Sequence, residues 1–91
     1  MQFEFDSAKS ESNKLKHGVD FVEIQALWNG PRVLVQAKSV EGQIRYAMLG
    51  VFKAQNYTVI VTYRGAIIRI ISARLSTPNE IETYEKYKDK K

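Results

Sequence analysis

The chain has 91 residues, of which 44% are hydrophobic, and a formal net charge of +4, which predicts one domain over residues 1–91 with a modest core. It contains no cysteine, which excludes a disulfide framework and a cysteine-based zinc site and fits a reducing compartment. The acidic N-terminus lacks the apolar run of a secretory signal, and no stretch approaches the roughly 20 apolar residues of a spanning helix, so we expect a cytoplasmic protein without a membrane segment.

The first predicted elements are a short strand and a helix. Phe3 and Phe5 alternate with polar residues, which suggests a short additional strand at the N-terminus. Asp6 or Ser7 then has the right side chain to cap a helix that we expect to run to about Lys16. The glycine that follows is the expected stop, because glycine tolerates the left-handed conformation after a helix.

A second helix is predicted after Gly18. Asp20 and Glu23 have capping-box spacing, and Val19 and Ile24 can form the hydrophobic staple. The apolar residues that would share one face of this helix are Phe21, Ile24, Leu27 and Trp28. The helix is expected to end at the Asn-Gly-Pro sequence that comes next.

After this sequence the hydrophobic pattern changes to that of strands. Four segments are rich in β-branched and aromatic residues and are separated by glycine or polar residues. They are Arg32 to Gln36, Gln43 to Phe52, Tyr57 to Tyr63 and Ala66 to Arg74. The break at Arg64 and Gly65 is short enough for a tight hairpin, so the last two strands are expected to pair antiparallel.

A C-terminal helix completes the predicted fold. Thr77 supplies a cap, Pro78 occupies the first helical position and Glu80 is the capping-box partner. The tail at residues 86–91 carries four lysines and one aspartate and is expected to be frayed. The predicted fold class is α+β, with two N-terminal helices, a four-stranded antiparallel sheet and a C-terminal helix.

The predicted sheet is cationic. Between Arg32 and Arg74, seven cations stand against the single acid Glu41, and all five arginines of the chain lie in this segment. A surface of this kind suits a polyanion or an acidic protein partner. Arg32, Lys53 and Arg64 are candidate RNA contacts on it.

The segment Ile68 to Arg74 reads Ile-Arg-Ile-Ile-Ser-Ala-Arg and places two guanidinium groups in an otherwise apolar strand. A fixed cation is costly to desolvate, so each must reach the sheet edge or meet an anion, and phosphate fits a guanidinium well. Side chains alternate along a strand, so Arg69 and Arg74 point to opposite faces unless a bulge or the strand's end intervenes. We expect Arg69 to reach a phosphate site directly, and Arg74 only if the strand bends before Leu75.

Several motifs together resemble the BrnT family of toxins. The matching residues are Asn13 to Val19, Phe21, Glu23, Arg45 to Gly50, Arg69 to Arg74, Glu80, Tyr84 and Glu85, in an order and spacing that agree over nearly the whole chain. The chain departs from the family at Phe5, where tryptophan is common, and at Leu75, where lysine is common. The second departure removes a cation close to the presumed site.

The resemblance implies a type II toxin with a RelE-like ribonuclease fold, which cleaves RNA without a metal or other cofactor and inhibits translation. It also implies a cognate antitoxin, a BrnA-like ribbon-helix-helix protein that forms a hetero-oligomer with the toxin. Operator DNA would be contacted only through that antitoxin.

Metal-free RNA cleavage needs a deprotonated 2′-hydroxyl, a stabilised phosphorane and a protonated leaving oxygen. We assign phosphate binding and transition-state charge to Arg45, Arg69 and Arg74, which occupy motif positions of the family. His17 is the only histidine, and imidazole is the side chain that most readily exchanges protons near neutral pH, so it is the candidate for proton transfer. Lys16 beside it could bind phosphate or tune the imidazole.

Two further residues are secondary acid-base candidates, and each candidate also has a structural interpretation. Glu23 fits the capping box as well as catalysis, and Tyr84 fits a core position with its hydroxyl at the rim. His17 and Lys16 could simply be favourable cations at a helix C-terminus.

The same ambiguity applies to the arginines and to the function. Arg45 and Arg69 could pair with Glu11, Glu23 or Glu80 across the helix-sheet interface. The chain could then be a non-catalytic RNA-binding domain with salt-dependent affinity. It could also be an inactive family member whose basic face chiefly binds an acidic antitoxin segment.

Overall fold

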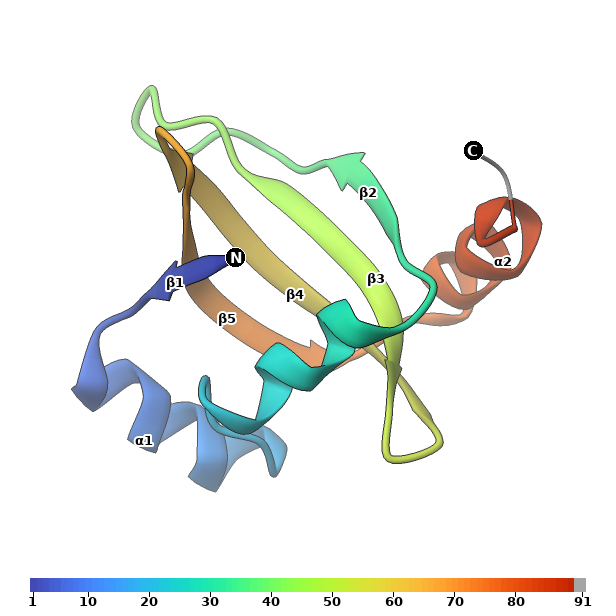
Figure 1. Ribbon diagram of the computed structural model, residues 1–91, viewed down its shortest axis with the longest axis horizontal. Helices are drawn as coiled ribbons and strands as arrows, with labels where there is room; N and C mark the ends of the chain where they lie inside the picture. Colours follow the sequence, from blue (N-terminus) through green and yellow to red (C-terminus); the bar gives the residue numbers. More distant parts are fainter. Residues whose placement is uncertain (90–91) are drawn as a thin grey trace.

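A five-stranded sheet forms the centre of the computed structural model, which describes residues 1–89 (Figure 1). The strands are β1 (Gln2–Glu4), β2 (Val33–Gln36), β3 (Tyr46–Phe52), β4 (Gln55–Arg64) and β5 (Ile67–Leu75). Their order across the sheet is β1-β5-β4-β3-β2. The pairs from β2 to β5 are antiparallel, whereas β1 pairs parallel with β5.

Three helical segments pack against this sheet (Figure 1). They are α1 (Ser7–His17), the 3-10 helix η1 (Glu23–Asn29) and α2 (Pro78–Tyr87). Residues 86–87 of the tail that was expected to fray are part of α2, and residues 90–91 of that tail lie outside the described residues. η1 and α2 cover opposite faces of the sheet, and α1 lies against β5. Within the described residues, no helix is long and apolar enough to cross a membrane.

The prediction of a four-stranded antiparallel sheet with two N-terminal α-helices is wrong. The sheet is five-stranded and mixed, because β1 adds in parallel to the outer edge of β5 and places Glu4 opposite Arg69. The alternation of Phe3 and Phe5 indicated a strand, but a partner so far away in the sequence leaves no local signal. The predicted second helix is the 3-10 helix η1, whose seven residues exceed the roughly three to four over which this tighter winding usually extends.

The local signals at the ends of α1 and α2 are confirmed. Asp6 Oδ1 accepts a hydrogen bond from the Lys9 N–H at 3.1 Å and caps α1, and Gly18 ends it with a φ of +82°. Thr77 and Glu80 exchange both hydrogen bonds of the capping box at the start of α2. The hairpin between β4 and β5 forms as predicted.

The two faces of the sheet bury different sets of residues. The first face packs against η1, and we call it the η1 face. It contributes Tyr57, Val59, Val61, Ile68, Ile70, Ala73 and Met48 to the core. On the opposite face, which we call the α2 face, Ala47 and Leu49 of β3 pack against Tyr84 of α2.

A β-bulge in β5 brings Arg69 and Arg74 to the same face of the sheet. The register of β4 against β5 shifts between Ile60 and Val61, which leaves one extra residue, Ile71, in β5. The buried residues of β5 on both sides of the bulge belong to the core under η1. Both arginines therefore point to the α2 face, and the bulge is one of the two ways in which the sequence analysis allowed this.

Asn13 fixes α1 to the edge of β5 beyond the end of β1. Its Nδ2 donates to the Ala73 carbonyl at 2.9 Å and to the Val19 carbonyl at 2.8 Å, and its Oδ1 accepts from the Ala73 N–H at 3.2 Å. The side chain thus satisfies backbone groups that a neighbouring strand would otherwise satisfy. The C-terminal half of α1 is held at the C-terminal end of β5.

Candidate functional site

Two arginines share one carboxylate at the end of the sheet where the β4–β5 hairpin turns. Arg69 Nη1 lies 2.9 Å from Glu4 Oε2, and Arg64 Nη1 lies 3.3 Å from the same oxygen. The side chains of Glu4 and Arg69 are 28% and 30% exposed, and that of Arg64 is 61% exposed. We call these three residues the Glu4 cluster, which has a net positive charge and is open to solvent.

Arg45 lies at the same end of the sheet. The hydroxyl of Thr62 donates to the Ile44 carbonyl at 2.9 Å, and Thr62 is the cross-strand partner of Arg69. Arg45 follows Ile44 directly, and its Nε donates to Gln43 Oε1 at 3.4 Å. Arg45 is therefore a third arginine at the end of the sheet where the Glu4 cluster lies.

A surface depression of about 410 Å³ adjoins the cluster at Arg64. Its lining consists of Gly42, Gln43, Ile44, Tyr46, Thr62, Tyr63 and Arg64. The rings of Tyr46 and Tyr63 meet edge to face with centroids 5.4 Å apart, and burial raises the pKa of Tyr63. The depression therefore combines a cation, aromatic rings and hydroxyl groups, which are the groups that bind phosphates and bases of single-stranded RNA.

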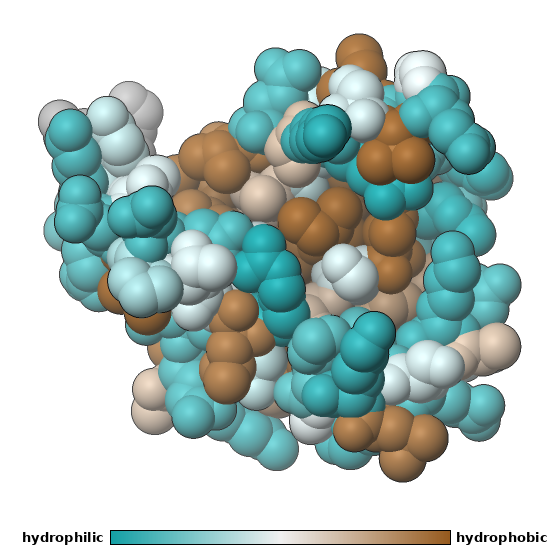
Figure 2. Space-filling view, turned by 180° about the vertical axis from the view of Figure 1, so that it is seen from behind, coloured by the Kyte–Doolittle hydropathy of each residue, from teal (hydrophilic) through white to brown (hydrophobic). Residues whose placement is uncertain are grey.

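The α2 face is apolar beside these charges. Figure 2 looks onto this face, with α2 on the left, and shows an apolar area next to the helix that hydrophilic side chains surround. Ile60 and Ile67 are among its half-buried residues. Arginine-rich and apolar surfaces thus lie next to each other on the same side of the sheet.

Arg74 is bound in a different way from Arg69. Its Nη1 and Nη2 donate to Oε1 and Oε2 of Glu80 at 2.7 Å and 2.9 Å. Glu80 Oε1 also accepts hydrogen bonds from the Thr58 hydroxyl at 2.9 Å and the Thr77 N–H at 2.8 Å. The bond from Arg74 lowers the pKa of Glu80 to about 2, and the same bond raises the pKa of Arg74. Arg74 therefore fastens the start of α2 to the sheet.

His17 and Lys16 lie away from the Glu4 cluster. Asp6, two residues after Glu4, caps the N-terminus of α1, and His17 is the last of the eleven residues of that helix. A helix of this length separates its two ends by roughly 16 Å. Within residues 1–89, neither His17 nor Lys16 makes a side-chain hydrogen bond or ion pair. The structure does not bring them to the arginines of the Glu4 cluster.

The sequence matches one known family over most of its length. The family is described as the ribonuclease toxin, BrnT, of type II toxin-antitoxin systems, and its model matches residues 5–80. The chain belongs to the BrnT family. No curated protein matches it. A ribonuclease toxin of a type II system has an antitoxin protein as its partner.

The predicted site residues of this BrnT-family chain fall into two groups along β5. Arg45, Arg64 and Arg69 lie at the hairpin end of the sheet. Arg74 lies at the other end of β5. Asn13 holds the C-terminal half of α1, which contains Lys16 and His17, at the same end. The structure therefore places the candidate residues of the sequence analysis at two ends of β5, with Arg69 and Arg74 in separate ion pairs.

Glu4 is the residue of the cluster that sequence reasoning missed. The available signal was the alternation of side chains in β1. Phe3 contacts Trp28 and Phe5 contacts Phe21, both on the η1 face. Glu4, which lies between the two phenylalanines, therefore points to the α2 face. The family match begins at residue 5, directly after it. Only the parallel pairing with β5 shows that Glu4 meets Arg69.

Glu23 links α1 to η1. Its Oε2 lies 2.6 Å from Lys14 Nζ and accepts the Asp20 N–H at 3.2 Å, while Asp20 Oδ1 accepts the Glu23 N–H at 2.8 Å. The hydrogen bond to Glu23 raises the pKa of Lys14, and the bond from the Glu23 backbone lowers the pKa of Asp20. Asp20 and Glu23 thus exchange the two hydrogen bonds of a capping box in the turn before η1, whose own N-cap residue, Val22, makes no side-chain capping bond. The ion pair of Glu23 with Lys14 adds to these bonds.

Tyr84 and Arg32 make contacts to the backbone. Tyr84 is 4% exposed, and its hydroxyl donates to the Pro31 carbonyl at 3.2 Å. Arg32 Nη1 donates to the Trp28 carbonyl at 2.8 Å, at the end of η1. Both side chains thus stabilise the segment between η1 and β2.

Lys53 and Arg64 lie near opposite ends of β4. Lys53 is in the turn that precedes this ten-residue strand, and its ammonium group lies 5.3 Å from the centroid of the Phe52 ring. A strand of that length spans roughly 30 Å. Lys53 and Arg64, two of the candidate RNA contacts, are therefore far apart on the sheet.

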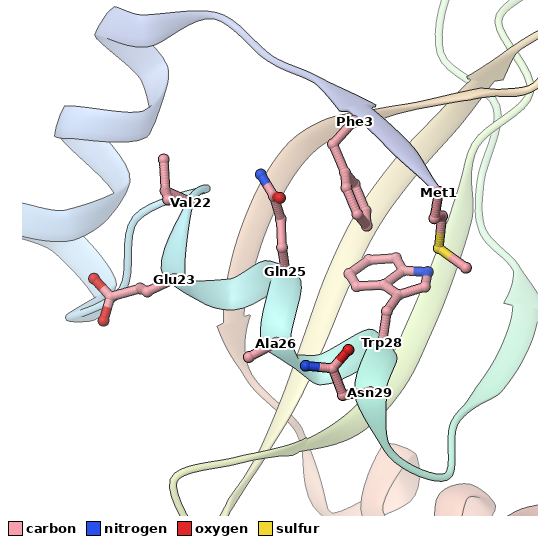
Figure 3. A pocket seen from close by; sticks show the side chains of 8 residues that line it. All are labelled: Met1, Phe3, Val22, Glu23, Gln25, Ala26, Trp28 and Asn29. Atoms are coloured by element: carbon pink, nitrogen blue, oxygen red, sulfur yellow. The ribbon is translucent and has the colours of Figure 1, made fainter.

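A groove between β1 and η1 offers space of a different kind (Figure 3). It measures about 540 Å³, and Phe3 and Trp28 meet edge to face in it with centroids 5.0 Å apart. Glu23 is the one charged side chain in its lining, so the groove does not attract a polyanion. Within the described part of the chain, no group of three or more His, Cys, Asp or Glu residues could hold a metal ion.

Proposed function

We propose that the chain is a metal-independent endoribonuclease that inhibits translation by cleaving RNA in the cytoplasm, and that its active site consists of the Glu4 cluster and Arg45. One observation carries the proposal. Arg64 and Arg69 converge from two strands on the same point, 3.3 Å and 2.9 Å from one oxygen atom, at an open end of the sheet. Membership of the BrnT family supplies the reaction class.

The convergence of guanidinium groups suits the charge that develops in RNA cleavage. Attack of a 2′-oxygen on phosphorus adds negative charge to the phosphate oxygens, and planar guanidinium groups donate to such oxygens in pairs. Arg69 is only 30% exposed, so its charge is less screened than that of a fully solvated lysine. These groups can supply the positive charge that a metal ion supplies in other nucleases.

The partner that we propose for the α2 face is a BrnA-like ribbon-helix-helix antitoxin. An amphipathic acidic segment of the antitoxin would match both the apolar area of this face and the arginines beside it. Such a segment would cover the Glu4 cluster in a hetero-oligomer and exclude RNA. Operator DNA would be bound by the antitoxin and not by this chain.

A second function is favoured by the ion pairs that the arginines already make. Arg69 and Arg74 each bind a carboxylate of the chain itself, at 2.9 Å and 2.7 Å. If these pairs persist when RNA binds, the chain is an RNA-binding protein or an antitoxin-binding partner without cleavage activity. The RNA would then be recovered intact after salt-dependent binding.

The two functions are separated by a cleavage assay on the purified chain. We expect it to cut both naked and ribosome-bound RNA in the presence of EDTA, and to arrest growth and translation when it is produced without its antitoxin. Arg69→Ala should abolish both effects. A folded wild-type chain that binds RNA but leaves it intact in both assays would reject the ribonuclease and establish the second function.

A further inference from the structure

We propose that Glu4 is a catalytic residue of this ribonuclease, the general base that takes the proton of the attacking 2′-hydroxyl. The inference rests on the proposed function and adds a residue that lies outside the part of the chain that the family matches, residues 5–80. Its basis is the position of the Glu4 carboxylate inside the arginine site.

The two oxygens of the Glu4 carboxylate have different surroundings. Oε2 accepts from Arg69 at 2.9 Å and lies 3.3 Å from Arg64, whereas Oε1 has no hydrogen-bond partner among residues 1–89. The side chain is 28% exposed. The arginines therefore hold the carboxylate in place through one oxygen, while the other oxygen is available to a ligand.

This position matches what a general base requires. A base must lie about 2.6–3.2 Å from the hydroxyl that it deprotonates, and that hydroxyl must be about 3–3.5 Å from the phosphorus atom it attacks. A phosphate that bound to Arg69 and Arg64 would lie beside Glu4, because both arginines contact its carboxylate at 2.9 Å and 3.3 Å. His17, the other candidate for proton transfer, is at the far end of α1.

The charged groups that face Glu4 are Arg69 from β5 and Arg64 from β4. Asp6, in the adjoining segment, faces away and caps α1 through the Lys9 N–H. Glutamate is ordinarily ionised at neutral pH and can accept a proton. The cluster therefore contains a proton acceptor and two cations that stabilise an anionic phosphorane, all in contact.

The step that we propose is balanced in protons and electrons. The 2′-oxygen transfers its proton to Glu4 and forms a bond to phosphorus, and the bond from phosphorus to the 5′-oxygen breaks with its electron pair on that oxygen. The leaving oxygen takes a proton from water, and the resulting hydroxide removes the proton from Glu4. The products are a 2′,3′-cyclic phosphate and a 5′-hydroxyl.

The test compares Glu4→Gln with Glu82→Gln, which removes the same charge from an exposed position on α2. We expect Glu4→Gln to lower the single-turnover cleavage rate at least 100-fold and to remove the acid limb of its pH profile. Binding of an oligonucleotide with 2′-deoxy groups should be unchanged or tighter, because a negative charge next to the phosphate site is lost. Glu82→Gln should behave as the wild type, with 2′,3′-cyclic ends on the products.

Each other outcome has a definite meaning. If Glu4→Gln has the rate and pH profile of the wild type, Glu4 is not the base, and the ribonuclease function still stands. A loss of cleavage that appears only in His17→Ala would lead to the same conclusion. A wild-type chain that cuts no RNA would overturn both proposals. If Glu4→Gln does not fold, Glu4→Asp decides, since a shortened base should retain the pH profile at a rate reduced about tenfold. An unchanged rate in Glu4→Asp would count against the base.

Discussion

Arg69 and Arg74 belong to one strand, point to one face of the sheet and each meet a glutamate, yet the two ion pairs differ in construction. Glu80 binds Arg74 through both of its oxygens and accepts two further hydrogen bonds, from Thr58 and Thr77. Glu4 binds Arg69 through one oxygen, which lies close to a second arginine as well. The first pair is internally satisfied, whereas the second leaves an oxygen and two cations open to a ligand.

This difference shows that the two arginines of the Ile68 to Arg74 motif have different roles. Glu80 belongs to the capped first turn of α2, so its pair with Arg74 joins a helix to the sheet. Glu4 belongs to a three-residue edge strand, and its side chain is 28% exposed. A fully hydrogen-bonded pair adds stability, and an incompletely bonded one is the better place for chemistry.

The largest effect that would test this comparison is on cleavage. We expect Arg69→Ala to lower kcat/KM about 100-fold or more, the usual loss when one preorganised donor to a transition-state anion is removed. Arg74→Ala, assayed at a temperature where it is folded, should stay within about fivefold of the wild type. Initial rates on a defined RNA measure both. Equal losses in the two variants would contradict the division of roles.

The next effect is on stability, and here the Arg74–Glu80 pair should matter more than the Arg69–Glu4 pair. Glu80→Ala removes a bidentate ion pair, a hydrogen bond from Thr58 and a helix cap, so it should lower the free energy of unfolding by about 2–3 kcal/mol. Glu4→Ala breaks a partly exposed pair that uses one carboxylate oxygen, and it should lower the free energy of unfolding by less than about 1 kcal/mol. Urea unfolding followed by circular dichroism gives both values. A larger loss for Glu4→Ala would show that the Glu4 cluster is structural.

A pH dependence follows from the lowered pKa of Glu80. Its pKa is about 2 in the folded chain against an ordinary value of 4.5, so the carboxylate contributes stability that is fully present above about pH 4.5. This contribution is lost as the pH falls from there toward 2. Glu80→Gln should therefore show a shallower fall in the free energy of unfolding over this window. Parallel curves for variant and wild type would rule out Glu80 as the group responsible.

The smallest effect concerns RNA affinity. Arg64 is the most exposed member of the Glu4 cluster and should contribute to phosphate binding. Arg64→Ala is therefore expected to weaken binding several-fold and to reduce the salt slope by about 1. Lys53, at the other end of β4, is a matched distant cation, and Lys53→Ala should change affinity by less than about twofold. Titrations of a 2′-deoxy oligonucleotide at several salt concentrations compare them. Equal losses would indicate a binding surface along all of β4.

Much of the local structure was predictable because its causes are local. The caps at Asp6 and Thr77 and the stop at Gly18 depend on hydrogen bonds between residues at most four apart, so the sequence displays them directly. The β4–β5 hairpin follows from the two-residue turn that begins at Gly65. The winding of η1 was not predictable, because capping-box spacing is compatible with either kind of helix.

The site was predictable only in part. The need of Arg69 for an anion was visible in its apolar strand, but its partner, Glu4, was not visible, because β1 and β5 meet only through tertiary packing. The partners considered for Arg69 were acids of the helices. The structure instead gives Glu80 to Arg74 and Glu23 to Lys14.

The sequence by itself determined the family, the capped helices, the antiparallel hairpin and the presence of two arginines that must find anions. It did so because these properties depend on motifs and on contacts between near neighbours in the chain. Only the tertiary structure decided that a bulge at Ile71 puts both arginines on one face, and that a parallel edge strand delivers a carboxylate to one of them. Register and edge pairing depend on how distant segments pack, and no single segment contains that information.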